Sequence, residues 1–363
     1  MKTRQLIQQF EPYSWEPSTS EIARRYGLRP SQVARLDLNT SPYTPRKWLA
    51  KIAKNLENMR VNLYPDTSYR ALREDLSKYT GMDVERFVIT NGADEALDIV
   101  VKTFLDQGSA AVISAPTYSY FRVATELMGG RAIFIQRHED FSDNIEGIIA
   151  ACRGEEARLV FLCSPNNPTG NTTDEKALRQ VLEESNATVV VDEAYYEYCG
   201  KTFAKLTNSY SNLIIVRTFS KAFALAGARV GYIIAAEETV RELNKARPPN
   251  SLSIISLALA STALHDLRQL KRMVEATLAE RERIYKELQK NSTITAYPSE
   301  ANFILIKLHK HNADEVHEKL MQRGLVVRKL SHVKGLENCL RISIGLPTQN
   351  NKLIRSLNTI LAG

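Results

Sequence analysis

The chain has 363 residues, of which 44% are hydrophobic and 25% are charged, and its formal net charge at pH 7 is +7. This composition excludes an intrinsically disordered chain, and the length favours two domains over one compact core. The basic residues are interspersed with nearly as many acidic ones, so the charge points to an anionic small molecule and not to nucleic acid.

The N-terminal residues 1–17 lack the unbroken apolar run of a signal peptide. The most apolar segment, residues 251–264, is too short and too rich in serine to span a bilayer. The four cysteines are far apart, and no histidine stands at metal-ligand spacing from any of them: Cys152, Cys163, Cys199 and Cys339. We therefore expect a cytoplasmic protein with reduced thiols, no metal site and no membrane partner.

Short runs rich in β-branched residues recur along the first two thirds of the chain, with helical segments between them. The runs cover residues 86–90, 110–114, 131–136, 158–163, 187–192, 212–218 and 229–236. Nearly continuous apolar strands separated by helices predict an α/β fold with a mostly parallel seven-stranded sheet flanked by helices. The last connection is too short for a full helical crossover, so the run 229–236 is expected to be antiparallel to its neighbours.

The sequence predicts the N-termini of two helices between these strands. Asp94 and Glu95 place acidic charge at the start of a helix over 93–106, and Thr173, Asp174 and Glu175 do the same for one over 174–184. A helical stretch over 253–290 then precedes strands over 302–308, 325–330 and 339–345, with a helix near 313–324. We therefore expect an N-terminal arm over 1–38, a large domain over 39–255 and a smaller α+β domain over 256–363.

Polar groups follow the carboxyl end of most predicted strands, where ligands bind in an open parallel sheet. The segments are NGADE, APTYSY, SPNNPTG, EAYY and FSK, and the last contains Lys221. A lysine in such a position is usually solvated. Partial burial instead lowers the pKa of the amine and suits it to Schiff-base chemistry.

The other strand ends supply the groups that pyridoxal phosphate requires of a protein. Each group also has an ordinary structural interpretation, such as a helix cap for Asp192 or a core position for Tyr118. Together they favour the cofactor. Asp192 would face the ring nitrogen and Tyr118 the ring, Asn167 and Tyr195 the phenolic oxygen, and the phosphate would meet Ala93, Asp94, Thr218, Ser220 and Arg229.

The words SPNNPTG, DEAY and TFSKAFALAGARVGY, in this order, resemble the fold-type I pyridoxal-phosphate aminotransferases. With YPD at 64–66, GADE at 92–95 and PTY at 116–118, the chain is similar over nearly its full length to the histidinol-phosphate aminotransferase family. The resemblance implies a fold-type I architecture and pyridoxal 5'-phosphate as cofactor. It also implies a homodimer with shared active sites, in which Tyr64 reaches the cofactor and substrate of the partner subunit.

The same resemblance implies residue roles and a reaction. Lys221 would bond the cofactor and then move a proton, with Asp192 and Tyr195 as the other catalytic groups. Arg341 would take the carboxylate of the amino donor. The remaining substrate contacts would come from Asn39 and Tyr64, with Arg328 and Tyr13 at the substrate phosphate. The implied reaction interconverts histidinol phosphate and 2-oxoglutarate with imidazole acetol phosphate and glutamate, a step of histidine biosynthesis.

Three alternatives remain open at this point. One is a decarboxylase acting on threonine phosphate, and another is an aromatic or broad-specificity aminotransferase. Both would use the same cofactor groups. The third is an aminotransferase-like ligand sensor in a transcription regulator, which would carry a winged helix-turn-helix before the aminotransferase part. We do not expect the sensor, because the segment before Asn39 is too short for such a domain.

Overall fold

The computed structural model describes residues 2–10 and 17–362, and its larger sheet has seven strands in the order β2-β8-β7-β6-β5-β3-β4. β8 is antiparallel to β2 and β7, and the other neighbouring pairs are parallel. The predicted α/β sheet and its antiparallel strand are both confirmed. The strands are β2 (Phe87–Thr90), β3 (Ala110–Ala115), β4 (Arg131–Gln136), β5 (Leu159–Cys163), β6 (Thr188–Asp192), β7 (Leu213–Thr218) and β8 (Gly231–Ile234).

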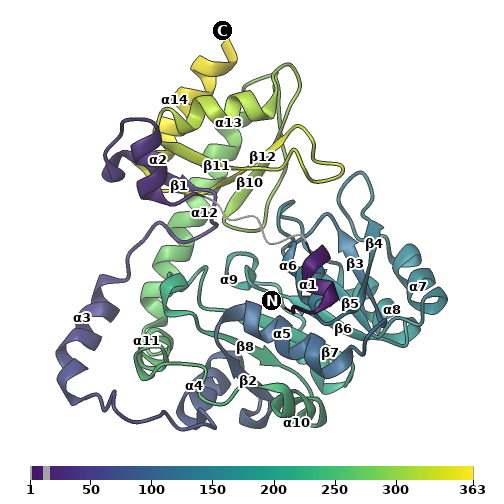
Figure 1. Ribbon diagram of the computed structural model, residues 1–363. Coiled ribbons are helices and arrows are strands. Elements are labelled where there is room, and N and C mark those ends of the chain that lie inside the picture. Colours follow the sequence, from purple (N-terminus) through teal and green to yellow (C-terminus); the bar gives the residue numbers. More distant parts are fainter. Residues whose placement is uncertain (1, 11–16, 363) are drawn as a thin grey trace.

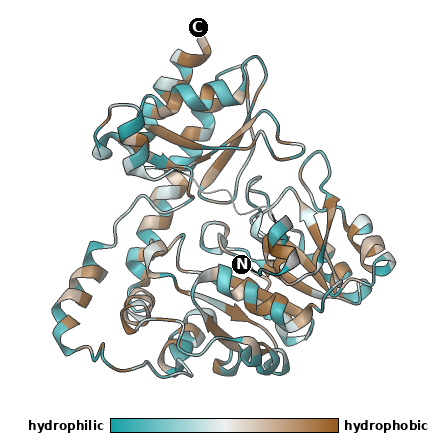
Figure 2. Ribbon diagram, viewed as in Figure 1, coloured by the Kyte–Doolittle hydropathy of each residue, from teal (hydrophilic) through white to brown (hydrophobic). Residues whose placement is uncertain are grey.

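Helices cover both faces of this sheet, which explains why its central strands are apolar on both sides (Figure 1). Successive residues of β6 enter different hydrophobic clusters: Val189 and Val191 pack on one face, and Val190 packs on the other. Figure 2 shows the strands as mostly hydrophobic, with hydrophilic residues on the helices around them. The covering helices include α5 (Gly92–Phe104), α6 (Tyr120–Leu127), α7 (Ile145–Gly154), α8 (Glu175–Glu184) and α10 (Glu237–Ala246).

The two helix starts lie within two residues of their predicted positions. In α5, Asp94 and Glu95 stand in the first turn, and the Glu95 carboxylate accepts a 2.6 Å hydrogen bond from the main-chain N of Asn91. In α8, the Asp174 side chain accepts from the main-chain N of Ala177 at 3.1 Å. Acidic residues at these helix N-termini accept hydrogen bonds from main-chain amides that lack a partner within the helix. Their negative charge also interacts favourably with the positive end of the helix dipole.

A smaller sheet of five strands has the order β1-β11-β12-β10-β9. β1 and β9, of three residues each, are additions to the predicted strands. β1 pairs in parallel with β11, so residues 34–36, expected within an N-terminal arm, form an edge strand of this sheet. The elements are β1 (Ala34–Leu36), β9 (Ile294–Ala296), β10 (Phe303–Leu308), β11 (Leu325–Lys329) and β12 (Cys339–Ser343), with helices α2 (Thr19–Arg25), α13 (Ala313–Met321) and α14 (Pro347–Ala362).

The helical stretch expected over 253–290 is two helices, α11 (Ile254–Leu264) and α12 (Leu267–Gln289). Asp266 separates them: its side chain caps α12 at Gln269 and accepts a 3.0 Å hydrogen bond from Trp48 Nε1. α12 runs from the larger sheet toward the smaller one (Figure 1). The remaining helices are α1 (Gln5–Gln9), α3 (Arg46–Asn55), α4 (Arg70–Thr80) and α9 (Tyr196–Cys199), and no helix in the described ranges is long and apolar enough to cross a membrane.

Candidate active site

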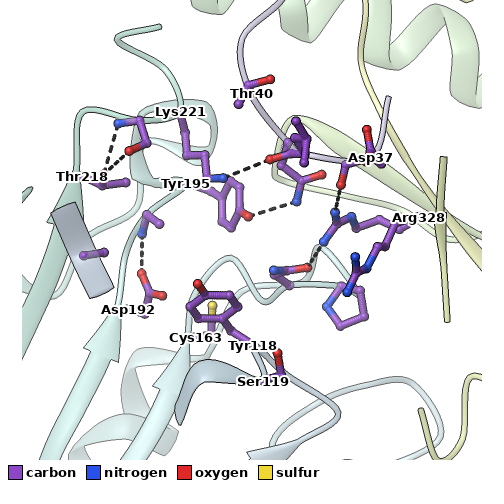
Figure 3. Close-up of a pocket in the computed structure, with 18 of the residues that line it drawn as sticks. Asp37, Thr40, Tyr118, Ser119, Cys163, Asp192, Tyr195, Thr218, Lys221 and Arg328 are labelled. Atoms are coloured by element: carbon purple, nitrogen blue, oxygen red, sulfur yellow. Dashed lines mark hydrogen bonds between the residues drawn. The ribbon is translucent and has the colours of Figure 1, made fainter. Parts of the chain in front are cut away.

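A cavity of about 570 Å³ lies where the carboxyl ends of the larger sheet meet the smaller sheet. Figure 3 shows Lys221 and Asp192 on one side of it and Arg328 across from them. Tyr64 is 86% exposed and is not part of the lining, and Tyr13 lies outside the described residues. The predicted residues that line the cavity are Asn39, Ala93, Asp94, Tyr118, Asn167, Asp192, Tyr195, Thr218, Ser220, Lys221, Arg229, Arg328 and Arg341.

Lys221 follows β7 and extends into this cavity. Its Nζ donates a 3.2 Å hydrogen bond to the main-chain oxygen of Leu38 and stands 5.7 Å from the centre of the Tyr195 ring. Burial and the nearby Arg341 cation lower the pKa of the Lys221 amine from 10.5 to about 8. The neutral, nucleophilic form of this amine is therefore more populated near neutral pH than in an ordinary lysine.

Asp192 is the last residue of β6 and is only 4% exposed. Its Oδ1 accepts a 2.9 Å hydrogen bond from the main-chain N of Ala194. Burial nevertheless raises the pKa of this carboxyl group to about 7, because the charged form has lost its water. A cationic partner would restore the ionised form, and a protonated ring nitrogen is such a partner.

A cluster of anion-binding groups lies around the N-terminus of α5. Gly92 has φ +81°, and a Cβ at this position would stand 2.7 Å from Arg229 Nη2, so the guanidinium packs directly against the first turn. Gly231 lets its strand, β8, approach the start of α5 equally closely, since a Cβ added at this position would lie 2.5 Å from the carbonyl carbon of Gly92. Thr218 and Ser220 add hydroxyl groups 2.9 Å apart. Helix amides, hydroxyl groups and a guanidinium together suit a phosphate.

Asp94 connects this cluster to the aromatic wall of the cavity. Its Oδ2 lies 2.9 Å from Arg229 Nη2, and its Oδ1 accepts a 2.9 Å hydrogen bond from the Tyr118 hydroxyl. A carboxylate is a poor ligand for phosphate, so the groups of Asp94 and Ala93 that suit an anion are their main-chain amides at the helix start. The Asp94 side chain instead orients Arg229 and Tyr118.

Asn39 connects Tyr195 to the smaller sheet. Its Nδ2 donates to the Tyr195 hydroxyl at 3.0 Å, and its Oδ1 accepts from Ser343 Oγ, on β12, at 2.8 Å. Burial raises the pKa of Tyr195, and the Arg341 cation opposes this. Arg341 donates to the Asn167 side chain and to the main-chain oxygen of Asp37. These contacts join the smaller sheet to the strand ends of the larger one.

The chemistry of these groups fits pyridoxal phosphate. The cavity combines the Lys221 amine, whose pKa is lowered, with the buried Asp192 carboxyl group, whose pKa is raised. It also contains the anion cradle at the start of α5, where a Cβ on Gly92 would collide with Arg229. Within the described ranges, no group of three or more His, Cys, Asp or Glu residues could hold a metal ion. The four cysteines are unpaired thiols.

The sequence did not predict Arg35, Asp37 and His332 as residues of the cavity. Arg35 faces Val326 across the β1–β11 pair and Arg328 faces Arg341 across β11–β12, so the three arginines share one face of the smaller sheet. Asp37 is a fully buried side chain that binds Arg35 through both oxygens, at 2.9 and 2.7 Å. The pairing of so short a strand beside β11 leaves no pattern in the sequence.

The lowered pKa of Lys221 gives a testable pH dependence. Apoprotein should bind pyridoxal phosphate faster as the pH rises, with a midpoint near 8, because only the neutral amine attacks a carbonyl. Arg341→Gln should move the midpoint upward, since it removes the cation that lowers the pKa most. Arg328→Gln, on the neighbouring strand, should move it less. Stopped-flow absorbance measures the rate, and a wild-type midpoint near 10.5 would contradict this account.

Comparison with known proteins gives one consistent result. Residues 32–357 match the family of class I and II aminotransferases. The histidinol-phosphate aminotransferase of Caldanaerobacter subterraneus subsp. tengcongensis is 37% identical over 90% of this chain and 93% of its own length. That of Methanocaldococcus jannaschii is 34% identical over 99% and 98%.

Among solved structures, the histidinol-phosphate aminotransferase of Sinorhizobium meliloti, in complex with pyridoxal-5'-phosphate, superposes with a TM-score of 0.89 at 26% identity. The match covers 99% of this chain and 98% of that one. The fold-type I resemblance of the sequence is thereby confirmed. The chain belongs to the class I and II aminotransferase family and, within it, to the histidinol-phosphate aminotransferases.

Proposed function

We propose that this protein is a pyridoxal-phosphate-dependent aminotransferase that interconverts histidinol phosphate and 2-oxoglutarate with imidazole acetol phosphate and glutamate. The observation that carries the proposal is the pairing of two sites in one cavity. One contains Lys221, Asp192 and the anion cradle of α5, and the other contains arginines of the smaller sheet. We place the enzyme in the cytoplasm, where its four thiols stay reduced.

When bound, pyridoxal phosphate supplies a carbonyl that condenses with amines and a ring that accepts electrons from the substrate α-carbon. Lys221 Nζ would take the α-proton and return it, and the lowered pKa of this amine suits it to both steps. Asp192 would keep the ring nitrogen protonated. Arg229 and the amides of the α5 N-terminus would hold the cofactor phosphate, and Tyr118 would lie against the ring.

The two arginines of the β11–β12 pair suit the two kinds of anion in this reaction. Arg341 is 8% exposed, is fixed by Asn167 and the Asp37 carbonyl, and is close enough to lower the pKa of Lys221. Arg341 would therefore hold a carboxylate beside the reacting carbon. Arg328, on the neighbouring strand, is only half-buried and suits the phosphate at the far end of the substrate.

Separate half-reactions test these assignments. Arg328→Ala should weaken the reaction with histidinol phosphate and leave the reaction with glutamate unchanged, whereas Arg341→Ala should do the reverse. Loss of one charge-assisted partner should lower the specificity constant roughly thirty- to several-hundred-fold. The absorbance of the cofactor, followed with one amine at a time, measures each half-reaction. Equal damage to both halves by Arg328→Ala would overturn the assignment of Arg328 to the substrate phosphate.

We also propose a homodimer in which each active site receives Tyr64 from the partner. The segment that carries Tyr64 exposes several large hydrophobic side chains close together in the sequence, as an interaction surface would. α3 lies at the rim of the molecule in Figure 1, with this segment following it. The side chains that a second copy would cover include Leu49, Leu56, Val61, Leu63 and Ile255.

Mixing two inactive variants tests the shared site. Lys221→Ala and Tyr64→Ala proteins, unfolded and refolded together, should form hybrid dimers in which one site has both intact residues. Equal mixing makes half of the dimers hybrid, so roughly a quarter of wild-type activity should return. Sedimentation confirms the dimer. If the hybrids stay as inactive as the separate variants, Tyr64 does not act across the interface.

A further inference from the structure

We infer that His332 is a further specificity-determining residue, which binds the phosphate monoester of the amine substrate together with Arg328. This inference rests on the proposed function and deepens it, because it assigns a second cationic ligand to the substrate phosphate. His332 and Arg328 both line the active-site cavity. Neither belongs to the anion cradle around α5, and Figure 3 shows Thr218 of that cradle across the cavity from Arg328.

The loop between β11 and β12 holds His332 in place. Main-chain hydrogen bonds fold this loop on itself, from Leu330 N to Cys339 O at 3.2 Å and from Val333 N to Leu330 O at 2.8 Å. Leu330 and Leu336 are buried, with exposures of 5% and 1%, and anchor the loop in a small apolar cluster. The His332 ring stays exposed on the cavity side of this fixed turn.

Two further arginines, Arg35 and Arg341, lie on the same face of the smaller sheet. Arg35 is bound by both oxygens of the buried Asp37 carboxylate. Arg341 donates to the Asn167 side chain and the Asp37 carbonyl. Arg328 and His332 also line the cavity, and both are more exposed than Arg341, so both are more open to a substrate phosphate.

The charged groups that face His332 are Arg328, Lys329 and Asp314. Lys329 Nζ lies 3.3 Å from Asp314 Oδ2, and Ser331 donates to Asp314 Oδ1 at 2.6 Å, so the carboxylate of α13 is already engaged. Partial burial and the two cations lower the pKa of His332 below its usual 6.5. A phosphate dianion in this position would favour the imidazolium form and raise the pKa again. Substrate binding is therefore expected to bring a proton to His332.

The sign of the resulting pH dependence follows directly. The extra affinity from His332 is fully present below the pKa of the free enzyme, where the ring is already charged. It declines as the pH rises through the higher pKa of the complex. A phosphate monoester has its second pKa near 6, so the substrate itself remains a dianion over most of this range.

Two substitutions and one control separate a charge role from a structural one. His332→Gln removes the titrating cation, and His332→Lys replaces it with one that stays charged up to about pH 9. His309→Gln alters another exposed histidine, which directly follows β10 and lies outside the cavity, and serves as the matched control. For each holoenzyme, KM and kcat for histidinol phosphate and for glutamate are measured from pH 6 to pH 9.

We expect His332→Gln to raise KM for histidinol phosphate roughly tenfold near pH 6.5, with kcat and the glutamate half-reaction unchanged. The ratio to wild type should shrink toward pH 9. His332→Lys should keep KM low over the whole range and bind the substrate more tightly than wild type near pH 9.

A His332→Gln enzyme with wild-type KM at every pH would overturn the inference while the proposed function stands. So would a loss that is independent of pH and equal for both amines. Failure of the wild-type enzyme to use histidinol phosphate would overturn the proposed function, and this inference with it. That result appears before any variant is made, so the two failures are distinct.

Discussion

Lys221→Ala is expected to abolish transamination, with a loss of several orders of magnitude in kcat, while the protein still binds pyridoxal phosphate. The loss is large because one amine both bonds the cofactor and moves the substrate proton. Affinity for the cofactor should persist through the groups around α5, namely Thr218, Ser220 and Arg229. The measurements are glutamate formation and the absorbance of the bound cofactor.

Borohydride reduction gives an independent measurement on the wild-type protein. It should fix the cofactor to Lys221, and peptide mapping should find the label on that residue. Lys245→Ala serves as the control, because Lys245 is a surface residue paired with Glu242 and should leave labelling and activity unchanged. A label on another lysine would contradict the assignment.

Asp192→Asn is expected to lower the rate of the chemical step by roughly 10²- to 10⁴-fold while the fold is kept. A neutral amide cannot stabilise a protonated ring nitrogen, so the cofactor loses its ability to accept electrons. The effect should appear in single-turnover measurements of either half-reaction. A near-normal single-turnover rate would mean that Asp192 is structural.

The same substitution should stabilise the apoprotein. The pKa of Asp192 is about 7 in the folded protein and 3.8 as a reference, so the folded state holds an extra proton between these values. Its contribution to the free energy of unfolding therefore falls as the pH rises from about 4 to 7. At pH 8, apo Asp192→Asn should be more stable than apo wild type by on the order of 2 to 4 kcal/mol. Thermal unfolding at pH 5 and pH 8 measures this, and an advantage that does not grow with pH would contradict it.

The strands of the larger sheet could be predicted from the sequence because they are buried on both faces and are therefore continuous runs of apolar residues. The candidate site followed from the same pattern, since residues at strand ends such as Lys221 and Asp192 meet at one edge by topology alone. The short connection before the segment RVGYIIAA also predicted that this strand is antiparallel.

Features that depend on contacts distant in sequence were not predictable. β1 becomes a strand only by pairing with β11, so Arg35 and Asp37 carried no pattern that placed them in the cavity. The break between α11 and α12 involves Asp266 and Trp48, which are far apart in the chain. Tyr64 lies on the surface of the single chain, so its assignment to a site depends on a second subunit.

The most direct measurement of the central claim is an assay of the purified holoenzyme with 2-oxoglutarate and either histidinol phosphate or threonine phosphate. Glutamate and carbon dioxide are followed in parallel. We predict stoichiometric glutamate from histidinol phosphate and no carbon dioxide from either amine. Carbon dioxide released from threonine phosphate, without glutamate formed from histidinol phosphate, would contradict the account and identify a decarboxylase.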